Sequence, residues 1–365
     1  MFRILHTEAS VGWGGQEIRI LGEMLGMKER GHTVSLSAPE HSQIYKRASS
    51  AGIKVFGIDF DRKSLFITGH KLRKLIQTER IQILNTHSSR DSWAGGIAGR
   101  IAGVKIIRTR HISSKLNANP GTKLVYGPLN DGIVTTGNFI KEQLVRELGI
   151  SPGKIYSIPT GIDVRKFMDA DAEKVRREFG IAEDEPVIGI AAALRSWKGH
   201  LHIVRAMSEV IRLYPKARFL AAGEGDLRKG ITELSAELRL QNSVILAGHR
   251  EDIPDIIAAF DVSVMASYAS EGIPQFALQS MAAGKPIVGT ETGGIPEVVK
   301  DGINGYIVPP KKPEALADAI LKLLSEPENA REMGLAGRRM AMENHTREKM
   351  LDDTEALYRK VLGCE

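Results

Sequence analysis

The segment from Ala266 to Pro286 carries residue types well suited to binding a negatively charged group. It leads from the end of an expected strand, through Glu271, into an expected helix with Pro274 at its first position. The unpaired N–H groups and the dipole at that helix start favour a phosphate or a negatively polarised sugar oxygen. Gln279 lies one to two turns into the helix, so its side chain and that of Glu271 could face one ligand. Glu271 could equally do no more than complement the helix N-terminus.

A second candidate is the pair Gly14 and Gly15, which follows the first apolar run. Because glycine lacks a Cβ, backbone N–H groups there can approach a ligand closely. The spacing is not G-x-G-x-x-G and no G-K-S/T follows, which argues against a dinucleotide fingerprint and a P-loop. Two D-x-D triplets, at 59–61 and 169–171, offer two carboxylates each, whereas an oxygen-ligand metal site needs several convergent groups. We therefore expect no metal and no other cofactor.

The composition excludes several classes of protein. With 42% hydrophobic and 26% charged residues, the chain lies in the range of soluble globular proteins rather than disordered or fibrous ones. Its single cysteine, Cys364, excludes a disulfide framework and a thiolate cluster for zinc or iron–sulfur. No apolar run approaches the ~20 residues of a membrane span, and residues 1–6 are typical of a strand rather than a signal peptide. These features predict a cytoplasmic protein.

The positive charge is concentrated in the first half of the chain. The net charge is +6, but residues 1–165 hold 24 Lys and Arg against 13 Asp and Glu, so the remainder is net negative. Such asymmetry favours an anionic partner for the first half: a phospholipid surface, a phosphorylated acceptor or a nucleic acid. A solvated surface without a partner is the alternative. Residues 62–74 mix five cations with Leu65, Phe66 and Ile67, which is typical of a membrane-interface segment or of an ordinary solvated helix.

Short apolar runs alternate with segments of helical period, which is the signature of βα units and parallel sheets. The runs of the first half are Phe2–Leu5, Thr33–Ser37, Lys54–Ile58, Ile81–Leu84, Lys105–Arg108, Gly132–Thr135 and Ile155–Ile158. Those of the second half are Val187–Ala191, Arg218–Ala222, Ser243–Leu246, Val262–Met265, Pro286–Val288 and Gly305–Val308. A break at 159–163 separates two doubly wound α/β domains. Ligands of such sheets bind beyond the carboxyl ends of the strands, so we expect the site in the cleft between the domains.

Several segments, in this order and at these spacings, resemble the pattern of glycosyltransferase family 4, whose members are retaining enzymes of the GT-B fold. The segments are Trp13–Glu17, Pro159–Asp163, Trp197–His200, Ala222–Gly225, Gly248–Asp252, Ser270–Pro274, Ala282–Pro286 and Thr292–Glu297. The resemblance implies two Rossmann-like domains facing a central cleft. Residues 1–163, with a C-terminal helix 346–362 packed back on them, form the acceptor side, and residues 164–345 bind the nucleotide-sugar.

The resemblance implies roles for several residues of the second half. Glu271 would bind hydroxyls of the donor sugar, with Gly272, Ile273 and Pro274 beside it in the donor site. The family has an acidic residue for the ribose eight positions after the glutamate, and here that residue is Gln279, which can still hydrogen-bond a diol but without charge.

A cation is implied at the donor diphosphate as well. Lys198 would neutralise the diphosphate, in place of a metal. The arginine that the family has five residues before this lysine is Ala193, so Arg195 is the nearby cation that could replace it.

In the first half the resemblance implies a donor-sugar contact from His111, which ends the segment 106–111. A strand-end histidine can also be only a hydrogen-bonded structural residue. The glycine pair would line the donor diphosphate and the acceptor side. Weaker acceptor-side candidates are Gln16, Glu17, His87, Arg90 and Asp91.

Together these features predict a retaining glycosyltransferase of cell-envelope polysaccharide or lipopolysaccharide synthesis. It would move a sugar from a nucleotide-sugar to a glycan or lipid-linked acceptor hydroxyl, in the cytoplasm or on the inner face of the membrane, with no nucleic-acid partner. One alternative is a sugar-nucleotide epimerase or hydrolase, with His6, His87 and His249 as candidate acids and bases. Another is a nucleotide-sugar-binding protein without turnover.

Overall fold

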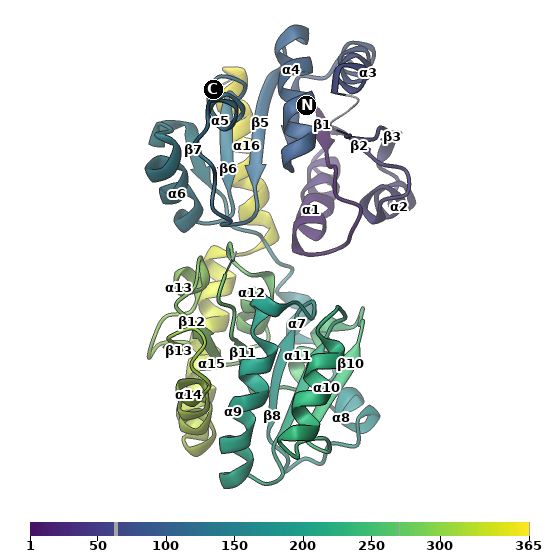
Figure 1. Cartoon of the computed structure of the whole chain (residues 1–365). Helices are drawn as coiled ribbons and strands as arrows, with labels where there is room; N and C mark the ends of the chain where they lie inside the picture. Colours follow the sequence, from purple (N-terminus) through teal and green to yellow (C-terminus); the bar gives the residue numbers. More distant parts are fainter. Residues whose placement is uncertain (62–64, 270, 365) are drawn as a thin grey trace. The chain divides into compact units, whose positions relative to one another are not determined.

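The computed structural model describes residues 1–61, 65–269 and 271–364. The chain forms two compact units (Figure 1): unit 1 consists of Met1–Gly161 with Arg347–Glu365, and unit 2 of Ile162–Thr346. Ser270, which belongs to one of the family-like segments, and residues 62–64 of the predicted basic stretch lie outside the described residues.

Unit 1 is a parallel α/β domain. Within the described residues its sheet has seven strands in the order β3-β2-β1-β4-β5-β6-β7. The strands are β1 (Arg3–Thr7), β2 (Thr33–Ala38), β3 (Lys54–Gly57), β4 (Ile83–Thr86), β5 (Lys105–Arg110), β6 (Gly132–Thr135) and β7 (Ile155–Ser157). The helices are α1 (Gly15–Glu29), α2 (Gln43–Ser50), α3 (Leu65–Thr78), α4 (Ser89–Ala102), α5 (Pro120–Tyr126), α6 (Asn138–Leu148) and α16 (Arg347–Leu362).

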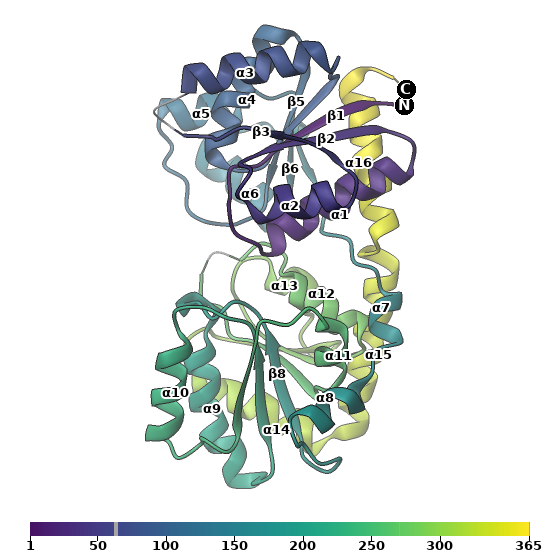
Figure 2. The same ribbon diagram turned by 90° about the vertical axis from the view of Figure 1, so that its right-hand side faces the viewer.

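Helices cover both faces of this sheet (Figure 2). Alternation along β1 puts Ile4 in a core cluster with α1, α2 and α16, and Leu5 in another with α3 and α4. The helix α16 is joined to this unit by buried polar contacts as well. The Tyr358 hydroxyl donates to Glu23 Oε1 at 2.9 Å, and Asn85 Nδ2 donates to the Tyr358 oxygen at 3.1 Å.

Unit 2 repeats the same architecture with a six-stranded parallel sheet among the described residues, in the order β10-β9-β8-β11-β12-β13. Its strands are β8 (Val187–Ala191), β9 (Arg218–Ala222), β10 (Val244–Gly248), β11 (Val262–Met265), β12 (Ile287–Thr290) and β13 (Gly305–Val308). Its helices are α7 (Arg165–Met168), α8 (Ala172–Glu178), α9 (His200–Leu213), α10 (Arg228–Glu237), α11 (Ile253–Ala258), α12 (Gln275–Ala282), α13 (Ile295–Val298), α14 (Pro313–Ser325) and α15 (Pro327–Asn344).

Both sheets are doubly wound, which confirms the predicted fold class of two Rossmann-like domains. In unit 1 the strand order reverses between β1 and β4, and in unit 2 it reverses between β8 and β11. In open α/β sheets, ligands bind outside the carboxyl ends of the strands at such a switch point. The loops that follow these four strands are therefore where a ligand site is expected in each unit.

All thirteen predicted apolar runs form strands, but some boundaries differ. β1 continues through His6 and Thr7, since the sheet pairs these residues with Leu36 and Ser37 of β2. Pro274 is not the first helical residue as predicted, because α12 begins at Gln275 and Pro274 precedes it with an extended ψ of 131°.

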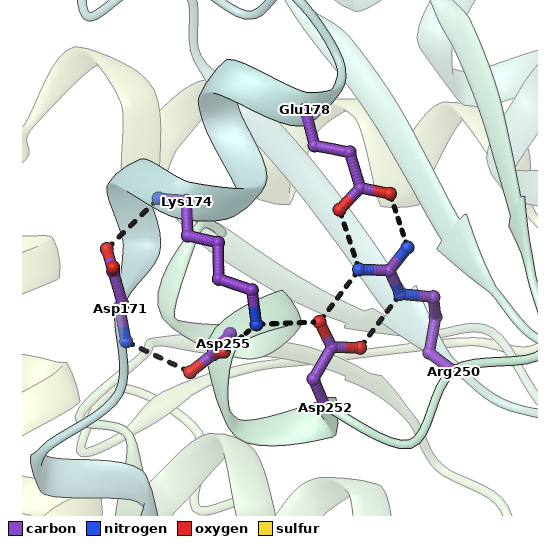
Figure 3. Close-up of polar contacts among 6 residues, drawn as sticks. All are labelled: Asp171, Lys174, Glu178, Arg250, Asp252 and Asp255. Atoms are coloured by element: carbon purple, nitrogen blue, oxygen red, sulfur yellow. Dashed lines mark hydrogen bonds and ion pairs between the residues drawn. The ribbon is translucent and has the colours of Figure 1, made fainter.

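A salt-bridge network ties α8 to the start of α11 in unit 2 (Figure 3). Arg250 makes paired hydrogen bonds to both Glu178 and Asp252, and Lys174 bridges Asp252 and Asp255 at 3.3 and 2.8 Å. These ion pairs give a structural role to Arg250 and Asp252 in the family-like segment 248–252. The Asp171 carboxylate accepts from the backbone N–H of Lys174 and so caps α8. Across the residues described, no group of three or more His, Cys, Asp or Glu side chains could hold a metal ion.

The predicted basic stretch 62–74 overlaps α3, which begins at Leu65. Phe66 and Ile67 are 92% and 63% exposed in its first turn. Within the described ranges, no helix combines the length and the apolar character that crossing a bilayer requires.

Candidate functional site

In unit 2, a lysine and a glutamate meet at the switch point. Lys198 ends the short 3₁₀ turn after β8, and Glu271 lies in the loop between β11 and α12. Lys198 Nζ donates to Glu271 Oε1 at 2.6 Å, and Ser267 Oγ donates to the same oxygen at 2.7 Å. The side chains of Lys198 and Glu271 are 23% and 7% exposed, so this ion pair is largely shielded from water.

The pair still has free hydrogen-bonding capacity. A lysine ammonium has three N–H donors, and among the described residues only Glu271 takes one of them, so two can bind an anionic ligand. The second carboxylate oxygen of Glu271, Oε2, accepts no hydrogen bond from the described residues and can accept one from a hydroxyl. The site can thus bind an anion and a hydroxyl-bearing group side by side.

Two glycines allow the loops around this pair to pack backbone against backbone. Gly199 has a φ of +78°, and a Cβ there would lie 2.0 Å from the carbonyl oxygen of Ala266. Gly293 has a φ of +57°, and a Cβ there would lie 2.2 Å from the carbonyl oxygen of Glu271. Only glycine fits such close approaches at positive φ. This requirement explains why the glycines of segments 197–200 and 292–297 accompany Glu271.

The other candidates of unit 2 lie on the same loops. Gly272, Ile273 and Pro274 are buried, and Gln279 is half-buried in α12. Arg195 is exposed, and its guanidinium lies 5.2 Å from the centroid of the Trp197 ring. Among the described residues, no hydrogen bond or ion pair joins Arg195 to the Lys198–Glu271 pair.

A buried histidine, which the sequence reasoning missed, lies beside Lys198. His200 is the first residue of α9 and is fully buried. Burial, and then the Lys198 charge, lower the pKa of His200 to about 4. The imidazole is therefore neutral at pH 7, and Lys198 provides the positive charge of this turn.

In unit 1, three histidines from neighbouring strands form a continuous ladder. His6 lies in β1, His87 follows β4 and His111 follows β5. His6 Nδ1 lies 2.9 Å from His87 Nε2, and His87 Nδ1 lies 3.1 Å from His111 Nε2. His6 and His87 are buried and stack with 6° between their ring planes, whereas His111 is half-buried.

Burial favours the neutral form of all three rings of the ladder. Burial lowers the pKa of all three histidines, and the nearby Arg19 lowers the pKa of His87 and His111 further. Arg19 is a buried residue of α1 that donates to Thr160 Oγ1 at 3.2 Å. Its Nε and Nη2 have no hydrogen-bond partner in the part of the chain described.

Two buried acids lie after the same strands: Asp91, which was a weaker acceptor-side candidate, and Glu8, which the sequence reasoning missed. Burial, followed by the charge of Asp91, raises the pKa of Glu8 to about 8. Burial likewise raises the pKa of Asp91, which accepts from Thr7 Oγ1 and from the backbone N–H groups of His87 and Ser88, each at 2.8 Å. A carboxyl group directly after a strand at the switch point is the sequence signal that could have identified Glu8.

The remaining candidates of unit 1 surround the start of α1. Gly14 precedes α1 and Gly15 is its first residue. Gln16 Nε2 donates to Glu8 Oε2 at 2.5 Å, and Glu17 is buried in the first turn. Arg90 is exposed in the first turn of α4, and within the described residues no hydrogen bond joins it to the ladder, so the structure joins His87 to His111 but not to Arg90.

The epimerase or hydrolase alternative names three histidines, His6, His87 and His249, which come from both units. His6 and His87 are bonded to each other in unit 1, with their rings stacked. His249 belongs to unit 2 and is exposed. Two of the three histidines named for this alternative therefore lie together in unit 1, and the third belongs to unit 2.

Two family models match the chain, one on each half. The model described as "Glycosyltransferase Family 4" matches residues 13–166, and the one described as "Glycosyl transferases group 1" matches residues 171–340. Among curated proteins, the N-acetyl-alpha-D-glucosaminyl L-malate synthase of Bacillus anthracis is 26% identical over 302 residues, which are 80% of this chain and 78% of that protein.

Two further proteins show the same likeness. The UDP-Gal:alpha-D-GlcNAc-diphosphoundecaprenol alpha-1,3-galactosyltransferase of Escherichia coli is 29% identical over 280 residues, 73% of this chain and 71% of that protein. Among solved structures, Anabaena HepE in complex with UDP superposes with a TM-score of 0.89 at 19% identity, over 98% of this chain and all of that one. This structural likeness places the two doubly wound domains in the GT-B fold.

Proposed function

We propose, from the premise that the chain belongs to glycosyltransferase family 4, that it transfers a sugar from a nucleotide-sugar donor to an acceptor hydroxyl with retention of the anomeric configuration. The observation that carries this proposal is the contact of Lys198 with Glu271 at the switch point of unit 2. In the proposal, the donor diphosphate accepts hydrogen bonds from Lys198, and Glu271 Oε2 accepts one from a hydroxyl of the donor sugar. Gln279 bonds the ribose.

The chemistry of the proposal needs charge stabilisation more than a protein base. As the bond between the sugar and the diphosphate breaks, Lys198 stabilises the negative charge that develops on the diphosphate oxygen. The acceptor hydroxyl attacks on the face from which the diphosphate leaves, and the departing oxygen takes the hydroxyl proton. In unit 1, His111 is the residue that we propose to hydrogen-bond a sugar hydroxyl. No metal or cofactor takes part in this proposal.

A glycan or lipid-linked acceptor of cell-envelope synthesis is the finer part of the proposal. The E. coli relative is named for a diphosphoundecaprenol acceptor, which supports an acceptor of this class. The excess of cations in residues 1–165 would favour such an anionic acceptor. We place the protein in the cytoplasm, in contact with the inner face of the membrane.

The membrane contact has a candidate surface on α3. Phe66 and Ile67 are exposed apolar residues at its start, and Lys71, Arg73 and Lys74 are exposed further along. Co-flotation with vesicles rich in anionic lipid should exceed that with zwitterionic vesicles and should fall with salt. The double variant Phe66→Ser/Ile67→Ser should lose flotation, whereas Ile101→Ser, 60% exposed on α4, should keep it. Flotation that is the same at low and high salt, and the same in the double variant as in the wild type, would contradict the proposed surface.

A donor panel tests the transferase itself. The full chain is incubated with UDP-, GDP-, ADP- and CMP-sugars and membrane extract, and thermal shift, nucleotide release and the anomeric configuration of the product are followed. One nucleotide class should stabilise the protein and be turned over, and Lys198→Ala and Glu271→Ala should lose turnover. Binding without release would favour the non-catalytic alternative, and inversion of a sugar carbon without transfer would favour the epimerase.

A further inference from the structure

The histidine ladder of unit 1 constrains where its protons can be. A neutral imidazole has one N–H and one lone pair, so each contact in the ladder needs a donor on one ring and an acceptor on the other. His87 uses both nitrogens, Nε2 toward His6 and Nδ1 toward His111. If His87 donates to one neighbour it must accept from the other. The tautomer of any one ring therefore fixes the tautomers of the other two.

Only two arrangements satisfy both contacts. In the first, His6 Nδ1 donates to His87, His87 Nδ1 donates to His111 Nε2, and His111 carries its proton on Nδ1. In the second, every proton is reversed, so His111 Nδ1 is a bare lone pair and His6 Nε2 carries an N–H. The arrangements differ at the two ends of the ladder, and the surroundings of the inner end, at His6, decide between them.

The inner end favours the first arrangement. His6 Nε2 is buried and has no hydrogen-bond partner among the described residues. A buried N–H without an acceptor is rarer in proteins than an unsatisfied acceptor. Burial lowers the pKa of His6, and the charge of Glu23 on α1 raises it to a smaller extent. However, the bonds that Glu23 Oε1 accepts come from Tyr358 on α16 and from Asn85 on β4, not from His6.

We infer that His87 and His6 are positioning residues that hold His111 as the neutral Nδ1–H tautomer, so that His111 offers a fixed hydrogen-bond donor to the donor sugar. Arg19 supports this state, because its charge opposes a second proton on His87 or His111. The catalytic part of the inference rests on the proposed function, but the tautomer does not. In this view His87, with both nitrogens engaged inside the unit, does not act on the acceptor itself.

The tautomer is tested by long-range ¹H–¹⁵N correlation spectra of the imidazoles in ¹⁵N-labelled full-length protein near pH 7. The wild type should show His111 as a single Nδ1–H species. His87→Phe keeps a ring of similar shape but removes both ladder nitrogens, so His111 should move to a mixture that contains the Nε2–H tautomer. His41→Phe, at an exposed histidine of the same unit, is the matched control and should leave His111 unchanged.

Turnover adds a second readout. Losing a correctly directed hydrogen bond to the sugar should lower kcat/KM in His87→Phe by about tenfold, the effect of ~1.4 kcal/mol. Because His87 acts through His111, the same change in a His111→Phe background should have little further effect. His6→Phe, which removes the inner end of the ladder, should repeat both results and replaces His87→Phe if that variant does not fold.

Three results would overturn the inference. The first is a charged or Nε2–H His111 in the wild type. The second is a His111 tautomer that stays unchanged in both His87→Phe and His6→Phe. The third is a loss of turnover from His87→Phe that is as large in the His111→Phe background as in the wild type. If no donor is turned over at all, the proposed function fails, yet the spectra still decide the tautomer.

Discussion

The ion pair between Lys198 and Glu271 makes a prediction that separates stability from catalysis. Lys198→Met keeps most of the aliphatic stem but leaves the Glu271 carboxylate, 7% exposed, with Ser267 as its remaining described partner. Removing one partner of a fully buried pair costs about 3–5 kcal/mol. Because the lysine side chain is 23% exposed and water screens it, we expect a smaller loss of about 2 kcal/mol. In a domain of this size, that lowers the thermal midpoint by about 4–8 °C.

The same substitution should have a larger effect on turnover. Removing one group that stabilises developing negative charge typically lowers kcat by about 10²–10³. Differential scanning calorimetry and nucleotide release, measured on the same preparations, follow the two effects separately. The double variant Lys198→Met/Glu271→Gln replaces the buried charge by an amide, so it should recover most of the thermal midpoint and none of the turnover.

A matched surface pair in the same unit provides the control. Lys216 contacts Asp184 at 2.5 Å, but both side chains are about two-thirds exposed. Lys216→Met should change the thermal midpoint and kcat little, because exposed pairs contribute about 0–1 kcal/mol. The reasoning on the ion pair is refuted if the double variant is no more stable than Lys198→Met. The reasoning on the diphosphate is refuted if Lys198→Met turns over the donor at the rate of the control.

Three further predictions concern the backbone, the ribose contact and pH. Gly199→Ala should lower the unfolding temperature of unit 2 much more than Gly180→Ala. A Cβ at Gly199 would lie 2.0 Å from a backbone carbonyl oxygen, whereas a Cβ at Gly180, also at positive φ, would have no atom within 4 Å. Similar thermal midpoints of the two variants in calorimetry would contradict this packing. Gln279→Glu should lower the KM for the donor by up to about tenfold with little change in kcat, because a charged acceptor forms a stronger hydrogen bond to the ribose. An unchanged KM in steady-state assays would show that Gln279 does not bind the ribose. In the folded chain the pKa of Glu8 is raised from 4.5 to about 8. The folded state therefore binds the Glu8 proton more tightly than the unfolded state, which adds stability that is complete below pH 4.5. This added stability decreases by up to about 1.4 kcal/mol per pH unit and is lost as the pH rises through 8. Glu8→Gln should therefore gain stability relative to wild type between pH 5 and pH 8 in urea titrations, and a difference independent of pH would show that Glu8 is ionised in the fold.

The strands could be predicted from the sequence because their signal is local. Runs such as Val262–Met265 are apolar, short and bounded by polar or small residues, and a buried parallel strand needs nothing more. The helix α4 is harder to predict from the sequence, because Gly95, Gly96 and Gly99 lower its helix propensity. Its capping box, formed by Ser88 and Asp91, was the available signal.

The site was less accessible to sequence reasoning, because its contacts depend on strand order. Lys198, Glu271 and His111 were predicted from motif resemblance, yet the bond between Lys198 and Glu271 requires β8 and β11 to be neighbours. The ladder requires β1, β4 and β5 to lie side by side, although 81 residues separate His6 from His87. Periodicity carries no information about which strands are adjacent.

The discontinuity of unit 1 has a consequence for its synthesis. Unit 2 is one uninterrupted stretch of chain, whereas Tyr358 of α16, fully buried in the core of unit 1, is made after it. At about 5–20 residues per second, roughly ten to forty seconds pass between the last N-terminal residue of unit 1 and the first residue of α16. During that interval the emerging first domain exposes the apolar groove that α16 will fill. Unit 1 can therefore complete its core only after the whole of unit 2 has been synthesised, and a chaperone has its longest access to the half of the protein that was made first.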